Sequence, residues 1–386
     1  MKIKTLTPEL VAGKIVLVRV DFNVPLKNGK ITEKTRIVES LPTLEFLLKN
    51  GAKKIHLLAH LGRPGGKICP EFSLAPVAAE LEKLLKKPVE FRSDFTAGSG
   101  KIQLHENVRF YPGEKKNDPA LATEILEKTG AEIFVNDGFG VSHRAQTSVI
   151  GFSGKIPCVA GKLVEKEIEH LSPFLSAEKI PGLTVAVGGV KMETKVAVLK
   201  HFCQIAENVI IGGALANTFL AAQGFDIGES LCESDFAKMA REVLEIAETH
   251  KTAVHLPIDV QCADDPDGKS VYLPTEDVAG SLKIFDIGPH SIASYREVLK
   301  HSKVVIWNGP LGFFEKPPFD SGTRAIAEEI AQNQSAKTIL GGGDTLGVLK
   351  QFGIEKSKFT HVSTGGGAML EFLEGKKLPG IEILKT

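Results

Sequence analysis

The sequence has 386 residues, of which 42% are hydrophobic and 24% are charged, a composition typical of globular proteins and sufficient for two hydrophobic cores. The 47 basic and 47 acidic residues leave a formal net charge of zero, whereas a protein that coats nucleic acid or an anionic membrane usually has a basic excess. No run of about 18 apolar residues predicts a membrane-spanning helix, so neither a nucleic acid nor a membrane is an expected partner.

The N-terminus and the cysteines predict a cytoplasmic location. Residues 1–8 are too polar for the core of a signal peptide. The cysteines form no C-x-x-C motif and have no zinc-site spacing, so we expect reduced, mostly buried thiols. They are Cys69, Cys158, Cys203, Cys232 and Cys262.

Short runs rich in Val, Ile and Leu recur along the chain, separated by amphipathic segments with helical spacing. Several runs are apolar at consecutive positions, as in parallel strands that helices cover on both faces. This alternation predicts an α/β fold of two Rossmann-like lobes, each a parallel sheet flanked by helices. The predicted strands are Ile15–Val20, Ile55–Ala59, Ile133–Val135, Leu183–Val187, Val209–Ile211, Ala253–Leu256, Val304–Trp307, Thr338–Leu340 and His361–Ser363, and the predicted helices include Leu74–Leu85, Ala120–Lys128, Val196–Cys203 and Thr323–Gln332.

The segment Leu163–Leu175 predicts a further helix, with apolar residues at helical spacing. The breaker cluster Ile180-Pro181-Gly182 follows it, and the next predicted strand begins directly afterwards. We therefore place the domain boundary here, with a first domain of residues 1–170 and a second of residues 171–367. The helix would be a hinge between the two lobes.

Polar and cationic residues follow the predicted strands of the first half. Ligands of open α/β sheets bind beyond the carboxyl ends of the strands, and guanidinium groups bind carboxylate and phosphate oxygens in pairs. Any one arginine is more often a solvated surface residue and any one histidine is more often structural, but several cations at strand ends favour an anionic substrate. The candidate substrate-binding residues are Asp21, Asn23, Arg36, His60, Arg63, Arg109 and Arg144.

Glycine follows the predicted strands of the second half, where peptide N–H groups and helix starts can approach phosphates. The cluster Gly341–Thr345 is the most informative, because Asp344 is a hard oxygen ligand suited to Mg²⁺ and Thr345 adds a hydroxyl. A helix N-cap is the structural alternative. The other clusters are Gly188-Gly189, Gly212-Gly213, Asn308-Gly309-Pro310 and Gly365-Gly366-Gly367.

Lys191 and Lys195 lie four residues apart, just after Gly188-Gly189. At the start of a helix they would share one face, where an anionic ligand between them would relieve the repulsion of the two charges. Two solvated lysines are the alternative. From the residues alone, the sequence indicates an α/β phosphotransfer enzyme.

Other functional classes lack their signatures. Gly268-Lys269-Ser270 is similar to the end of a P-loop, but Ala263 occupies the position of the first glycine. A two-lobed dehydrogenase would need a G-x-G-x-x-G motif after a strand, and none is found. A non-catalytic, anion-binding receptor would need a signal peptide and no glycine-rich lobe.

The motifs together closely resemble the phosphoglycerate kinase family over almost the full length. In the first half the resemblance rests on Arg19–Pro25, His60–Pro64, Glu106–Phe110 and Asn136-Asp137 ahead of His143-Arg144-Ala145. In the second half it rests on Leu256–Asp259, Asp286–Pro289, Val305–Pro310, Gly341–Thr345 and His361–Ala368.

The resemblance implies a glycolytic kinase that transfers a phosphoryl group reversibly from 1,3-bisphosphoglycerate to ADP, giving 3-phosphoglycerate and ATP, with Mg²⁺. It implies a monomer whose tail, about residues 368–386, packs back on the first lobe. The acid would bind to the residues named above for the first half. Nucleotide binding would fall to Lys195, Gly213, Asn308, Glu315, Gly342, Gly343, Asp344 and Thr345, with Asp344 at the metal, and the catalytic groups would be Arg36, Lys191, Lys195, Gly343 and Gly366.

Three positions depart from the family pattern. Thr194 stands where Asp or Ser is usual, Gln146 stands where His is frequent, and the segment after Gly212-Gly213 lacks a third glycine. These departures concern local geometry rather than the reaction. Because the attacking carboxylate is already ionised at neutral pH, the reaction needs in-line positioning, neutralised charge and closure of the hinge, and no general base.

Overall fold

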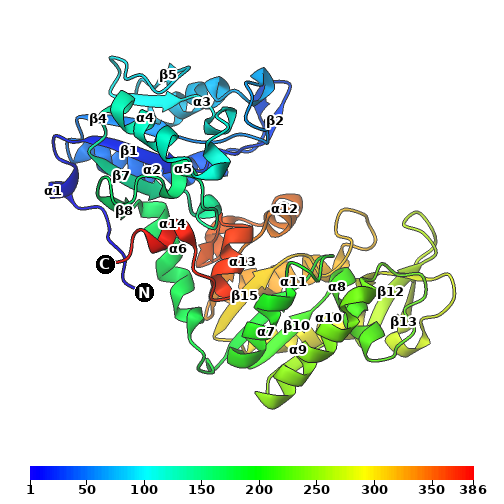
Figure 1. The fold of residues 1–386 in the computed structure, drawn as a ribbon. Helices are drawn as coiled ribbons and strands as arrows, with labels where there is room; N and C mark the ends of the chain where they lie inside the picture. Colours follow the sequence, from blue (N-terminus) through cyan, green and yellow to red (C-terminus); the bar gives the residue numbers. More distant parts are fainter. The chain divides into compact units, whose positions relative to one another are not determined.

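Two six-stranded sheets of parallel strands organise the chain, and the computed structural model describes all 386 residues. One sheet belongs to a unit formed by residues 1–172 and 376–386, and the other belongs to a unit formed by residues 173–375 (Figure 1). Helices flank both sheets, which confirms the predicted α/β fold. None of the helices is both long enough and apolar enough to cross a lipid bilayer.

The sheet of the first unit has the strand order β5-β6-β4-β1-β7-β8. Its central strand β1 (Ile15–Val20) is buried at almost every position and pairs in parallel with β4 and β7. The surrounding strands are β4 (Lys54–Leu58), β5 (Glu90–Arg92), β6 (Ile102–His105), β7 (Ile133–Asp137) and β8 (Cys158–Ala160), with a separate hairpin of β2 (Leu26–Lys27) and β3 (Lys30–Ile31). The helices are α1 (Pro8–Val11), α2 (Thr35–Lys49), α3 (Ala75–Leu85), α4 (Pro119–Thr129), α5 (Thr147–Ile150), α6 (Lys162–Leu171) and α14 (Pro379–Glu382).

Local signals set the ends of these helices. In α4 the Asp118 carboxylate accepts a hydrogen bond from the N–H of Ala120 at 2.9 Å, Pro119 occupies the first turn, and Gly130 ends the helix in the left-handed conformation. The predicted helix Leu163–Leu175 is helical throughout but changes type, because α6 ends at Leu171 and a 3₁₀ turn, η5 (Ser172–Leu175), follows. Pro173 lacks the N–H that would continue the α-helix.

Buried Asp137 joins the end of β7 to the start of α6. Its Oδ1 accepts hydrogen bonds from the N–H of Leu163 at 3.0 Å and the hydroxyl of Thr43 at 2.8 Å. A Cβ at Gly161 would lie 2.2 Å from the same oxygen, so only glycine fits there. Burial raises the pKa of Asp137 to about 8.

The C-terminal residues 376–386 belong to the first unit. Ile3 and Lys385 form an antiparallel bridge, and the N–H of Lys4 donates to the carbonyl of Leu384 at 2.7 Å. The side-chain amide of Asn136 donates to the carbonyl of Gly380 at 2.8 Å. Both termini are therefore fixed on the same unit (Figure 1).

The sheet of the second unit has the strand order β11-β10-β9-β15-β16-β17. Its central strand β9 (Leu183–Val187) is completely buried and pairs in parallel with β10 and β15. The other strands are β10 (Asn208–Ile211), β11 (Ala253–His255), β15 (Val304–Asn308), β16 (Lys337–Leu340) and β17 (His361–Val362). The helices are α7 (Val196–Ile205), α8 (Gly213–Ala222), α9 (Ala237–Thr249), α10 (Pro289–Lys300), α11 (Ser321–Gln332), α12 (Gly343–Phe352) and α13 (Gly367–Leu373).

The second unit also contains an antiparallel sheet that the sequence did not predict. It consists of β12 (Asp259–Ala263), β13 (Val271–Pro274) and β14 (Lys283–Ile287), with β12 in the middle. Every residue of β12 is buried, although Asp259 and Gln261 are polar. The hydroxyl of Ser291 donates to Asp259, and the side-chain amide nitrogen of Gln261 donates to Ser270. With these polar residues the strand lacks the apolar run by which the parallel strands were recognised.

Candidate functional site

The first group of candidate residues lies beyond the carboxyl ends of β1, β4 and β7, which are neighbours in the sheet. Asp21 and Asn23 follow β1, His60 and Arg63 follow β4, and Arg36 lies in the first turn of α2. Arg109 lies in the 3₁₀ turn η2 (Val108–Phe110), and Arg144 follows η4 (Phe139–Val141).

Asp21 organises one side of this group. Its Oδ2 accepts a hydrogen bond from Nη1 of Arg36 at 2.7 Å, and Oδ1 lies 3.9 Å from Nδ1 of His60. The side-chain oxygen of Asn23 accepts the N–H of Gly62 at 2.9 Å. The loops that follow β1 and β4 are therefore fixed to one another before any ligand binds.

Arg109 forms the other side of the group. Its Nη1 donates to the carbonyl of Gly62 at 2.6 Å, while Nε and Nη2 are buried without a protein partner. Burial and the charges of Arg144 and Arg19 lower the pKa of Arg109 to about 10. Unpaired donors on a buried cation are suited to an anionic ligand, because they cost free energy until they are satisfied.

Two buried residues at this site, Arg19 and Glu114, were not singled out as site residues from the sequence. Arg19 on β1 is fully buried and contacts His60. Glu114, also fully buried, accepts hydrogen bonds from the backbone N–H and the hydroxyl of Ser148. Its carboxylate offsets part of the positive charge of Arg19 and Arg109. Glu114 lies in no motif quoted above, and Arg19 lies inside one that drew attention to Asp21 instead.

The remaining cations differ in their contacts. Arg144 is half-buried, and its Nε donates to Nε2 of His143 at 3.1 Å. Arg63 is exposed beside Gly62. Arg144 also contributes to lowering the pKa of His60, together with burial, Arg19, Arg109 and Arg36. The group as a whole concentrates positive charge and hydrogen-bond donors, which can bind a small acid with more than one negative charge.

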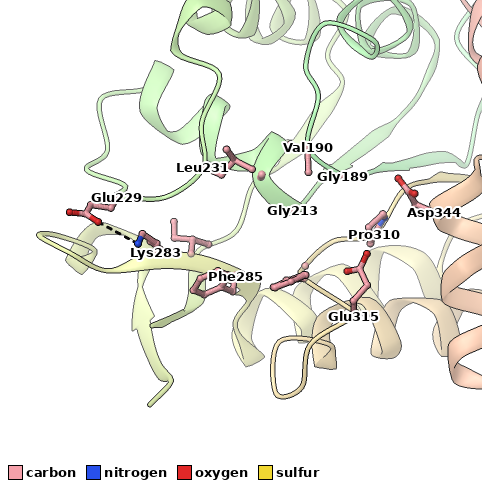
Figure 2. A pocket seen from close by; sticks show the side chains of 14 residues that line it. Gly189, Val190, Gly213, Glu229, Leu231, Lys283, Phe285, Pro310, Glu315 and Asp344 are labelled. Atoms are coloured by element: carbon pink, nitrogen blue, oxygen red, sulfur yellow. Dashed lines mark ion pairs between the residues drawn. The ribbon is translucent and has the colours of Figure 1, made fainter. Parts of the chain in front are cut away.

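Three candidates of the second group, Gly213, Glu315 and Asp344, line a cavity of ≈ 540 Å³ in the second unit (Figure 2). Much of its wall is apolar or backbone. The lining residues are Gly189, Val190, Gly213, Ala214, Glu229, Leu231, Lys283, Ile284, Phe285, Pro310, Gly312, Phe313, Glu315 and Asp344. The cavity has the size and wall of a site for a nucleoside phosphate.

Glycine is required where the loops of this wall approach each other. Gly213, at the start of α8, has φ +65°, and a Cβ there would lie 3.0 Å from the backbone N and O of Gly189. Gly342 has φ +102°, and a Cβ there would lie 2.7 Å from Nδ2 of Asn308. Gly213 lines the cavity, so a peptide group rather than a side chain forms its surface there, whereas Gly342 is not among the lining residues.

Asn308 and Thr345 fix the loops that follow β15 and β16 through hydrogen bonds to their backbone. The side-chain amide of Asn308 donates to the carbonyl of Gly341 at 2.7 Å. The hydroxyl of Thr345 is buried, donates to the same carbonyl at 2.8 Å, and accepts the N–H of Gly309 at 2.8 Å. Gly343 starts α12, and Gly366, with φ +53°, precedes α13. Neither is among the residues that line the cavity.

Lys191 and Lys195 do not share a helix face, contrary to the expectation from their spacing. The helix α7 begins only at Val196, after a bend in which Lys191 is exposed and Lys195 is buried. Nζ of Lys195 donates to the carbonyl of Gly188, and burial lowers the pKa of Lys195 to about 8, against the opposing effect of Asp344. Lys195 supports the loop, whereas Lys191 is free to reach a ligand.

Charged side chains lie at opposite ends of the cavity. Figure 2 shows Asp344 and Glu315 towards one end, and Glu229 with Lys283 at the other, where an ion pair of 3.4 Å joins them. Asp344 is exposed at the start of α12 and has no protein ion-pair partner. No group of three or more histidine, cysteine or acidic side chains is placed to hold a metal.

Sequence reasoning missed the apolar lining of the cavity. Leu231 lies in a loop, and Phe285 lies on β14 of the unpredicted antiparallel sheet. Behind Phe285, buried Asp286 accepts the N–H of Gly322, at the start of α11, at 2.7 Å. The carbonyl of Phe285 accepts the N–H of Phe313 at 2.7 Å, which fixes the loop that carries Phe313. Burial raises the pKa of Asp286 to about 7.

Known proteins are similar to this chain in sequence and in fold. The sequence model of one protein family, described as phosphoglycerate kinase, matches residues 6–376. A structure of phosphoglycerate kinase from Coxiella burnetii is 42% identical with a TM-score of 0.87, and the match covers 97% of this chain and 96% of that one. The crystal structure of phosphoglycerate kinase from Pyrococcus horikoshii OT3 is 32% identical with a TM-score of 0.82, with the same 97% and 96% coverage.

Proposed function

The chain belongs to the phosphoglycerate kinase family, and on that premise we propose how its residues divide the work of the reaction. The enzyme is a phosphotransferase with a carboxyl group as acceptor, and it transfers a phosphoryl group reversibly between 1,3-bisphosphoglycerate and ADP in glycolysis. The proposal concerns which groups bind each substrate, where Mg²⁺ binds, and what stabilises the transition state.

The acid binds to the cationic group of the first unit. Asp21, Asn23, Arg36, His60, Arg63, Arg109 and Arg144 are the binding residues. The observation that carries this assignment is Arg109, which is 4% exposed and has two nitrogen donors without a protein partner. A carboxylate or phosphate oxygen would satisfy both donors with charge-assisted hydrogen bonds.

The nucleotide binds in the glycine-walled cavity of the second unit. Its phosphates lie at the end marked by Asp344, where the first turn of α12 offers peptide N–H groups, and its base lies against the apolar wall near Phe285. Gly213, Gly342 and Gly343 admit the close approach of the phosphates. Asn308, Thr345 and Lys195 act by holding those loops, and Glu315 lines the wall.

The residues present fit Mg²⁺. This ion typically binds through one or two carboxylates together with substrate phosphates rather than inside an all-protein cage. Asp344 is exposed at the phosphate end of the cavity, and Glu315 lies towards the same end (Figure 2). When bound there, Mg²⁺ neutralises phosphate charge, and Asp344 is the residue that holds it.

Charge around the moving group replaces acid–base catalysis. The phosphoryl group passes between a carboxylate oxygen and the β-phosphate oxygen of ADP, and both are ionised at neutral pH whichever of them attacks. The protein must therefore align the reactants and offset the negative charge that spreads over the phosphoryl oxygens. Arg36, Lys191, and the backbone N–H groups of Gly343 and Gly366 supply that charge. In-line transfer also requires the two bound substrates to meet, so the proposal includes closure about the segment near α6 and η5. It also includes a monomeric state and a cytoplasmic location.

The test is a coupled assay with ATP, 3-phosphoglycerate and Mg²⁺, applied to the wild type and to Lys191→Ala. We expect kcat to fall about 10²–10³-fold in the variant with little change in KM, because the exposed ammonium stabilises the transition state rather than binding the ground state. Lys200→Ala is the matched control, since Lys200 lies on α7 and pairs with Glu242 at 2.6 Å. A pure KM effect would make Lys191 a binding residue.

Calorimetry and scattering test the division of labour and the closure. Arg109→Met should weaken binding of 3-phosphoglycerate at least about 10²-fold and leave binding of ADP intact. Small-angle scattering should show compaction only when both substrates are bound. An unchanged scattering profile in the ternary complex would remove closure from the proposal.

A further inference from the structure

Arg19 is a fully buried cation directly beside His60. It projects from β1, and its Nη1 donates to the carbonyl of Leu58, at the end of β4, at 3.3 Å and to its own neighbour Val20. Its Nη2 lies 3.2 Å from Nδ1 of His60. A buried guanidinium costs free energy, so a contact of this kind needs an explanation beyond the joining of two strands.

The chemistry of the two groups determines which nitrogen of His60 carries the proton. A guanidinium has five N–H donors and no acceptor. The atom facing Nη2 must therefore accept, which requires a lone pair on Nδ1 of His60. A neutral imidazole with an unprotonated Nδ1 carries its hydrogen on Nε2.

The surrounding charges oppose a second proton on His60. Burial, and after it the charges of Arg19, Arg109, Arg144 and Arg36, hold the pKa of His60 well below its usual value. The one facing carboxylate belongs to Asp21, whose Oδ1 lies 3.9 Å from Nδ1, beyond hydrogen-bonding distance. Asp21 is already engaged by Arg36 at 2.7 Å.

We propose that Arg19 is a positioning residue that holds His60 as the neutral Nε2–H tautomer, so that His60 offers the acid substrate a hydrogen-bond donor without a charge. This inference rests on the proposed function, which places His60 at 3-phosphoglycerate. The opposite tautomer would direct a lone pair at the anionic oxygens and repel them. Arg19 therefore decides whether His60 attracts or repels the substrate, without touching it.

The tautomer can be measured directly in the wild-type chain without ligand. Two-bond ¹H–¹⁵N correlation spectra should show His60 with Nε2 protonated and Nδ1 unprotonated, unchanged between about pH 5 and 8, where an unperturbed histidine titrates. A protonated Nδ1, or titration of His60 in this range, would overturn the proposal. Because no substrate is present, this result is independent of the proposed function.

Two substitutions of His60 separate the roles of its nitrogens. In His60→Gln the side-chain amide can place an N–H near the position of Nε2, whereas in His60→Asn it can replace only Nδ1. We expect the Asn variant to bind 3-phosphoglycerate about tenfold more weakly than the Gln variant, the value of roughly one neutral hydrogen bond. Equal affinities, or the reverse order, would contradict the proposal.

Arg19→Lys and Arg19→Met test the positioning role itself. We expect the His60 signals in the Met variant to shift towards a protonated Nδ1, with Asp21 as its nearest acceptor, and the affinity for 3-phosphoglycerate to become dependent on pH. The Lys variant retains a donor and should keep the wild-type tautomer. If Arg19 only joined β1 to β4, both variants would change stability and leave the tautomer and the pH profile unchanged. Failure of the wild type to bind 3-phosphoglycerate would refute the proposed function and leave the tautomer result intact.

Discussion

The two units present their candidate binding groups at the same place, beyond the carboxyl ends of parallel strands, but they build those groups from different parts of the chain. The first unit uses long side chains held by buried partners, as Arg36 is held by Asp21. The second unit uses loops whose shape depends on glycine, as at Gly213 and Gly342. The lesson is that the same sheet geometry can serve a site made of side chains or a site made of backbone.

This difference predicts opposite sensitivities to mutation. In the first unit, removing atoms from a side chain should be damaging, because the side chain is itself the donor. In the second unit, adding a single carbon at a glycine should be damaging, because it distorts the loops that carry the peptide donors.

The largest effect is expected for Arg109→Met. The substitution removes the buried cation whose Nε and Nη2 lack a protein partner, and two charge-assisted hydrogen bonds to the substrate would be lost. At roughly 1.5–3 kcal/mol each, the dissociation constant for 3-phosphoglycerate should rise at least 10²-fold, as measured by calorimetry. The affinity for ADP should not change.

Arg109→Lys is the matched variant. It keeps the charge but cannot direct two donors from one planar group, so we expect an intermediate loss. If the Lys variant bound 3-phosphoglycerate as the wild type does, charge alone would matter at this position. The first unit would then depend less on side-chain geometry than its contacts indicate.

The next largest effect is expected for Gly213→Ala. A residue other than glycine at φ +65° is strained, and the new methyl group would lie 3.0 Å from the backbone of Gly189. The combined cost of about 1–3 kcal/mol should weaken ADP binding about tenfold, with no effect on 3-phosphoglycerate. Gly347→Ala is the control. Gly347 lies inside α12, and the Cβ of an alanine there would lie 3.6 Å from the ring of Phe314, which is an ordinary contact distance. Equal effects of the two substitutions would show that the conformation of Gly213 is not what binding requires.

The sequence predicted most strands of the parallel sheets because they are largely apolar runs, but it missed β5, β6 and β8, which are short or contain polar residues. The predicted bounds of Ile15–Val20 and Leu183–Val187 are those of β1 and β9. The antiparallel sheet was missed because β12 alternates polar and apolar residues that are all buried, and burial of a polar residue depends on partners distant in sequence, such as Ser291 for Asp259. Periodicity contains no information about such partners.

The candidate site was predictable to a similar extent. Strand ends and motifs indicated Asp21, Arg36 and His60, and the structure brings these three together. The environment of Lys195 was not predictable, because its burial depends on where α7 begins. Arg19 was not predictable either, since a buried arginine on a strand has the same local sequence as an exposed one.

The two units also differ in the ionisable groups buried beneath their sites, and the pH dependence of local stability tests this difference. His56 on β4 is buried and hydrogen-bonded to His105 at 2.9 Å, and burial lowers the pKa of His56 to about 3. Between about pH 3 and 6.5 the unfolded state binds a proton that the folded state does not, so the stabilising contribution of His56 is complete above about pH 6.5 and is lost as the pH falls. In His56→Gln the free energy of opening of β4, measured by hydrogen exchange, should lose a slope of about 1.4 kcal/mol per pH unit.

Asp286 in the second unit should behave in the opposite way. Because burial raises its pKa to about 7, the folded state keeps a proton that the unfolded state releases above about pH 4. Its contribution is therefore complete below about pH 4 and is lost as the pH rises towards 7. Asp286→Asn should remove that decline from the opening of β14 and leave β4 unchanged. If His56→Gln and Asp286→Asn removed pH slopes of the same sign from the opening free energies of β4 and β14, the proposed difference between the two buried groups would be contradicted.

The smallest effect is expected for Glu229→Gln, at the end of the cavity away from Asp344. Its ion pair with Lys283 spans 3.4 Å between side chains that are 63% and 36% exposed. Exposed pairs contribute little and are screened by salt, so KM for ADP should change less than about threefold, and less again at high ionic strength. A tenfold change would mean that this pair contacts the nucleotide directly. The second unit would then bind its ligand partly through charged side chains. It would differ from the first unit only at the phosphate end of the cavity, where backbone groups form the site.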